Sequence, residues 1–192
     1  MDEQQLEIDR LLRNAVDHAR PVIHGIEQGQ FTAPTPCADY DVRGLLNHLM
    51  QVVIGFQHVA RKQQMDLDEQ EVLTDDWKSE FDAESERLIQ AWSEPGALQG
   101  ESSGMGLPQS VTVQLILGDL VIHPWDLARA TGQTFEPDDE LLQLLYGALQ
   151  QMAPMGRKMG AFGPEVQVPA DAPLFDRLLG LVGRDPSWAP PA

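Results

Sequence analysis

Apolar residues recur every three or four positions over long stretches of this chain, and this spacing constrains the fold more than any other feature. The first stretch covers 4–20 and stops before Pro21. A second follows Asp41, a residue type favoured as a helix N-cap, and a third covers about 76–92. The second stripe consists of Leu45, Leu49, Val52 and Phe56. Each pattern predicts an amphipathic helix with one apolar face.

The second half of the chain continues the pattern. A fourth helix is predicted over about 110–130, and a fifth begins near Pro137, because proline is favoured at the first helical position. EVQV at 165–168 is predicted to be a short strand. A last helix is predicted from Asp171, with Gly183 closing it.

The predicted fold class is all-α, a four-helix bundle with a short C-terminal strand and helix. With 192 residues, 42% of them hydrophobic, the chain is expected to form a single domain over 1–192. The strand and last helix belong to a C-terminal extension over about 160–188.

The charge of the chain excludes several classes of partner. The 30 acidic and 13 basic residues give a formal net charge of -17, which argues against nucleic acids and anionic membranes. A single cysteine excludes a disulfide framework and a Cys-rich zinc site. The acidic N-terminus lacks the features of a signal peptide, and no apolar run is long enough to cross a bilayer, so a cytoplasmic location is predicted.

One stretch holds about half of the negative charge. Residues 66–86 contain ten acidic side chains and one basic one, Lys78, for a net charge of -9. We interpret this stretch as a solvated loop and helix face, with attraction of cations or of a basic partner as the alternative.

Polar residues interrupt the apolar stripes at a few positions. His48 lies three residues after Leu45 on the second helix, so it shares that helix's apolar face. On the fourth helix, Asp119 and His123 are four residues apart and share a face, and Asp126 lies on the same side. A buried carboxylate is costly unless it is paired or bound to a metal. Two imidazoles and a carboxylate facing each other across a bundle core form a set of ligands suited to a divalent metal.

The spacing of these residues is also compatible with interpretations that involve no metal. Either histidine could be a hydrogen-bonded core residue, and Asp119 with His123 could form an internal ion pair. Pro124 is expected to kink the helix beside His123 or to end it early. Cys37 is interpreted as a small packing residue, with a thiolate stabilised by the following helix N-terminus as the alternative.

Three sequence blocks resemble a known family. TAPTPCADYDVRGLLNHL at 32–49 and GDLVIHPWDLARATGQ at 118–133 resemble the two metal-binding blocks of the DinB-like family that includes the metal-binding domain of mycothiol-dependent maleylpyruvate isomerase. FGPEVQVPADAPLFDRLLGLVGRDPSW at 162–188 is similar to the ending of an uncharacterised actinobacterial branch. The resemblance implies a divalent metal held by His48, Asp119 and His123, with zinc expected and nickel as the alternative.

The resemblance also implies a class of reaction. Family members with known activity look like thiol-dependent transferases or isomerases. The resemblance implies that the metal activates a low-molecular-weight thiol, here mycothiol, for attack on a small electrophile. Trp125 and Asp126 are expected beside the ligands or on the pocket wall. Two features depart from the family pattern: Asp119 is a short carboxylate, and Pro124 replaces a small or polar residue.

Two other functions fit the same residues. The protein could be a metal-binding or stress-response bundle without catalysis, or a metal-free protein with a structural Asp/His network. The sequence leaves open whether it forms a homodimer.

Overall fold

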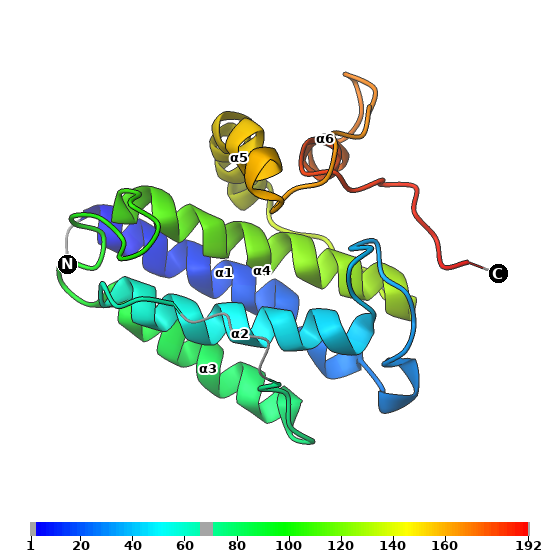
Figure 1. Ribbon diagram of the computed structural model, residues 1–192, viewed down its shortest axis with the longest axis horizontal. Coiled ribbons are helices and arrows are strands. Elements are labelled where there is room, and N and C mark those ends of the chain that lie inside the picture. Colours follow the sequence, from blue (N-terminus) through cyan, green and yellow to red (C-terminus); the bar gives the residue numbers. More distant parts are fainter. Residues whose placement is uncertain (1–2, 66–70, 192) are drawn as a thin grey trace.

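A computed structural model describes residues 3–65 and 71–191, and its architecture is all-α as predicted. Four long helices pack side by side as a bundle, and two further helices pack against each other outside it, next to α4 (Figure 1). The bundle helices are α1 Glu3–Gly25, α2 Val42–Ala60, α3 Trp77–Ser93 and α4 Gln109–Thr131. The outer helices are α5 Asp139–Met159 and α6 Leu174–Leu181, and a short 3-10 helix, Gln28–Gln30, follows α1.

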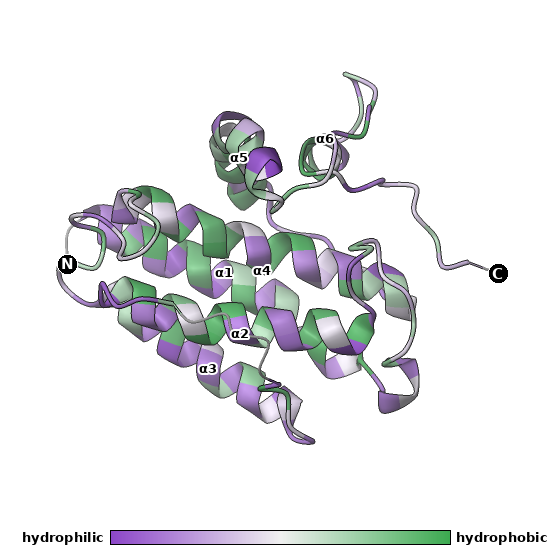
Figure 2. Cartoon of the chain, viewed as in Figure 1, coloured by the Kyte–Doolittle hydropathy of each residue, from purple (hydrophilic) through white to green (hydrophobic). Residues whose placement is uncertain are grey.

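The predicted apolar stripes form the core of the bundle. Leu45 and Leu49 are fully buried, and Val52 and Phe56 are 3% exposed. Apolar and polar bands alternate along the helices (Figure 2). Among the described residues, no helix is long and apolar enough to cross a membrane.

Two prolines that were expected to end or distort helices lie inside them. Helix α1 continues through Pro21 to Gly25, and Val22 and Ile23 beyond the proline are buried. Helix α4 likewise continues through Pro124 to Thr131. A proline removes one helical hydrogen bond, but burial of the following turn holds the helix together. Asp119, His123 and Asp126 therefore remain on one continuous helix.

Helix α5 begins later than predicted. It starts at Asp139 rather than at Pro137, because the side chain of Asp138 accepts hydrogen bonds from the backbone N–H groups of Glu140 and Leu141. A side-chain acceptor for the first free amides determines where the helix begins more strongly than proline does.

The C-terminal region differs from the prediction in two respects. Helix α6 begins at Leu174 after Pro173, and not after a cap at Asp171. The predicted strand at 165–168 does not form, because no other strand exists in the described parts of the chain to pair with it. Instead, the N–H of Val166 donates to the carbonyl of Gly180 at 2.9 Å, which fastens this segment to α6.

Gly183, just after α6, allows two backbone segments to touch. Its φ is +85°, in the left-handed region, and a Cβ built there would lie 2.7–2.9 Å from backbone atoms of Gly163. We predict that Gly183→Ala lowers the free energy of unfolding by about 2–4 kcal/mol, combining backbone strain with overlap.

Chemical denaturation measures this effect, and Gly147→Ala is the matched control. A Cβ at Gly147, inside α5, meets nothing within 4 Å, so that substitution should be neutral or stabilising by up to about 1 kcal/mol. Equal stabilities for the two variants would contradict the close contact at Gly183.

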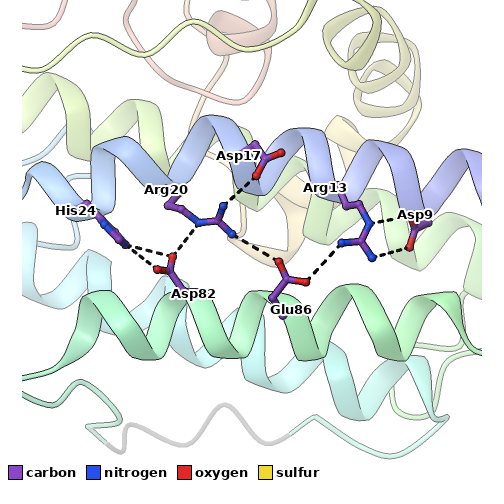
Figure 3. A network of polar contacts seen from close by, with 7 residues as sticks. All are labelled: Asp9, Arg13, Asp17, Arg20, His24, Asp82 and Glu86. Atoms are coloured by element: carbon purple, nitrogen blue, oxygen red, sulfur yellow. Dashed lines mark hydrogen bonds and ion pairs between the residues drawn. The ribbon is translucent and has the colours of Figure 1, made fainter.

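Much of the acidic stretch 66–86 is paired within the chain. Residues 66–70 lie outside the described residues. On α3, Asp82 contacts Arg20 and His24 of α1, and Glu86 lies between Arg13 and Arg20 (Figure 3). These carboxylates therefore help to hold α1 against α3.

Candidate functional site

The sequence-predicted residues meet where α2 faces α4. The imidazole rings of His48 and His123 stand edge to face, with centroids 5.2 Å apart and planes at 82°. Asp119, one turn before His123, places Oδ1 3.5 Å from His123 Nε2. The fold thus brings the side chains of His48, Asp119 and His123 together from two helices.

His123 lies between two carboxylates. It is 8% exposed, and its Nδ1 lies 3.3 Å from Oδ2 of Asp126, one turn further along α4. With its proton on Nδ1, the ring donates to Asp126 and leaves the Nε2 lone pair facing Asp119. A carboxylate that holds the far nitrogen of an imidazole in this way is a common partner of metal-binding histidines.

Asp126 is in turn held by an arginine from the C-terminal region. The Asp126 side chain is fully buried, and Arg184 Nε donates to Oδ1 at 2.9 Å while Nη2 donates to Oδ2 at 3.0 Å. This is a bidentate, charge-assisted pair. Burial lowers the pKa of the Arg184 guanidinium, but the charge and hydrogen bonds of Asp126 outweigh burial and raise it overall. A chain of contacts therefore runs from Arg184 through Asp126 to His123.

His48 is a neutral imidazole. Burial, and secondarily the charge of His123, lowers the pKa of His48 to about 4. Tyr40, just before α2, stacks on the ring with centroids 5.2 Å apart and planes at 14°. Neither nitrogen of His48 has a hydrogen-bond partner within 3–65 and 71–191. The lone pair of this neutral ring is thus unused among the described residues.

The negative charge of the Asp119 carboxylate is poorly compensated by its neighbours. Its side chain keeps 30% exposure, and burial of the rest raises its pKa, while His123 and Arg184 act in the opposite direction. Unlike Asp126, it has no arginine at hydrogen-bond distance among the described residues. A cation next to this carboxylate would favour its ionised form.

As the side chains stand, they do not form a complete metal site. No group of three or more His, Cys, Asp or Glu side chains in the described parts of the chain is arranged to hold a metal ion. Asp119 and His123 nevertheless fit as a pair, because two ligands about 2.1 Å from one tetrahedral ion lie roughly 3.4 Å apart. His48 would join them by rotating its side chain, which is allowed between staggered rotamers.

Trp125 does not face these residues. It lies two positions after His123, about 200° around the helix. Its ring packs edge-on against Phe175 of α6, and it lines a shallow pocket of about 180 Å³ with Arg129 and Phe135. Of the two residues expected beside the ligands or on the pocket wall, Asp126 contacts the predicted ligand His123, whereas Trp125 packs toward the C-terminal region.

Sequence reasoning missed two residues of the site, Arg184 and Tyr40. In the sequence, Arg184 directly follows an apolar helix and Gly183. An arginine at such a position is usually solvated, so the sequence does not indicate that it is buried. Cys37 is half-buried, and burial raises the pKa of its thiol, with Arg184 opposing this effect. Cys37 packs against the hydrophobic core, in agreement with the packing interpretation.

The fold and these residues define a class: all-α bundle proteins with a histidine–carboxylate site between two helices. The family model described as mycothiol maleylpyruvate isomerase N-terminal domain matches residues 12–128. The chain therefore belongs to that family, as the sequence blocks indicated. Arg184 lies outside the matched residues.

Individual relatives agree with this assignment. Two uncharacterized proteins, from two strains of Mycobacterium tuberculosis, are each 28% identical over 176 residues, covering 90% of this chain and 94% of their own. A crystal structure of the mycothiol-dependent maleylpyruvate isomerase matches with a TM-score of 0.62 and 17% identity, over 81% of this chain and 75% of that one. At that identity the match supports the fold alone.

Proposed function

We propose that the protein binds a divalent metal ion, with zinc expected, through His48, Asp119 and His123, and that it is a mycothiol-dependent transferase or isomerase. The observation that carries the proposal is the set of contacts around His123. Its Nε2 faces Asp119, its Nδ1 is held by Asp126, and the unpaired imidazole of His48 stands against its ring. Family membership supports mycothiol as the thiol.

In this proposal each residue of the site has a defined role. His48 contributes a neutral nitrogen, and Asp119 and His123 contribute the two ligands one turn apart. A bound divalent ion supplies positive charge that lowers the pKa of a thiol next to it. Asp126 accepts a hydrogen bond from the Nδ1–H of His123 and so favours the tautomer with Nε2 unprotonated, and Arg184 keeps Asp126 in place.

The proposal is tested by a thiol-dependent assay. We expect protein loaded with zinc to accelerate the reaction of mycothiol with a small electrophile, such as monobromobimane, or the mycothiol-dependent isomerisation of maleylpyruvate. The rate should exceed that without protein, and both removal of the metal by a chelator and His48→Ala should abolish the excess.

The results of this assay distinguish a catalytic protein from a metal-binding bundle without catalysis. Full metal occupancy without any excess rate on either substrate would contradict the catalytic proposal and leave a metal-binding bundle. An excess rate that survives both chelation and His48→Ala would instead contradict the assignment of the metal site.

A further inference from the structure

The outer helix α5 carries an apolar stripe that the chain leaves partly uncovered. Among the described residues, the exposed large apolar side chains are Leu6 at 53%, Met155 at 60% and Met159 at 76%. The two methionines extend a row with 4, 4, 3 and 4 spacing, which lies on one side of the helix. The row consists of Leu144, Ala148, Met152, Met155 and Met159, and its first three members are half-buried.

This stripe is separate from the face that α5 buries within the chain. The buried residues are Leu141, Leu142, Leu145, Leu149 and Ala153. Their mean direction lies about a quarter turn from that of the stripe. Helix α5 lies outside the four-helix bundle (Figure 1), and Met155 and Met159 at the C-terminal end of the stripe are exposed. Methionine side chains are adaptable and are enriched at protein interfaces.

Charges beside the stripe indicate what covers it. Glu140 lies in the first turn of α5 and Lys158 lies near its end, 18 residues later, which is five full turns. The two side chains therefore lie on the same flank of the stripe, with opposite charge at opposite ends. When two copies of such a helix pack antiparallel, each Glu140 faces the Lys158 of the other copy. Within its own chain Glu140 already pairs with Arg10 of α1, yet its side chain stays 61% exposed, while Lys158 has no ion-pair partner among the described residues.

The charge of α5 as a whole is also suited to self-association. The helix holds two acidic residues in its first turn and two basic residues in its last, for a net charge of zero. A chain with a formal net charge of -17 repels its own copies over most of its surface. A neutral, apolar helix at the edge reduces that repulsion where two chains meet.

We propose that the protein forms a homodimer through antiparallel packing of α5 against α5 of a second copy. The contact is isologous: Leu144 of each chain meets the region of Met155 in the other, and Ala148 and Met152 lie near the two-fold axis. This inference is independent of the metal site, which lies between α2 and α4.

The test is the mass of the full chain in solution, measured by sedimentation equilibrium over a range of concentrations. We expect a dimer whose dissociation constant rises at least about tenfold in Met155→Glu, because a charge then replaces a buried thioether. Gln150→Glu is the matched control, since Gln150 is exposed on the same helix away from the stripe, and it should leave the dimer unchanged. Circular dichroism checks that each variant folds.

Charge reversal tests the antiparallel geometry. Lys158→Glu should weaken the dimer several-fold, because each copy then places a glutamate against Glu140 of the other. A wild-type chain that remains a monomer at every concentration would overturn the proposal. A dimer that is unchanged by Met155→Glu or by Lys158→Glu would overturn it too.

Discussion

Arg184→Ala is expected to lower the free energy of unfolding by about 3–5 kcal/mol, because it leaves the Asp126 carboxylate buried without its partner. The Asp126 side chain is fully buried and accepts hydrogen bonds from two nitrogens of Arg184. Removing the guanidinium leaves Asp126 to be protonated or to draw in water, and both are costly in this position. Urea denaturation followed by circular dichroism measures the loss.

Two further variants serve as controls for this prediction. Arg61→Ala removes an exposed ion pair with Glu94, whose side chains are 40% and 49% exposed, and should cost less than about 1 kcal/mol. The double variant with Asp126→Asn and Arg184→Met removes both charges and should recover part of the stability. If Arg184→Ala lowers the free energy of unfolding no more than Arg61→Ala does, the buried pair of Arg184 and Asp126 does not stabilise the fold as predicted.

For the metal site, His48→Ala and His123→Ala should each weaken zinc binding at least about a hundredfold, since each removes one of only three protein ligands. Titration against a zinc-binding dye measures the affinity. Asp119→Asn keeps the size of the side chain and removes its charge, so it should fall between wild type and the histidine variants.

His58→Ala is the matched histidine control. His58 lies near the end of α2, is exposed, and contacts Gln63 through Nδ1 at 3.0 Å, away from the site. It should bind zinc as the wild type does. Equal losses in His58→Ala and His48→Ala would show that zinc binds to histidines in general and not at the proposed site.

The bundle and the meeting of His48 with His123 could be predicted because both depend on local helical periodicity. Residues three and four apart lie on one face whether or not the partner helix is known. The polar residues on those faces must then meet in the core. Pro124 does not end α4 early, because the buried residues after it keep the helix continuous.

The remaining features depend on contacts between distant parts of the chain. Arg184 lies 58 residues after Asp126, and nothing in the local sequence indicates that the two pair. Val166 binds the backbone of Gly180 instead of a second strand, so its β-favouring sequence was misleading. The ion pairs of Asp82 and Glu86 with α1 likewise follow from helix packing and not from the acidic stretch itself.

The most direct test of the central claim is the metal content of the full chain, expressed without a His tag and purified without chelators. We expect about one divalent ion per chain in the wild type, and a loss of that ion in a variant that combines His48→Ala with His123→Ala. Less than about 0.2 ion per chain in the wild type, even after incubation with zinc and removal of the excess, would contradict a metal site at His48, Asp119 and His123.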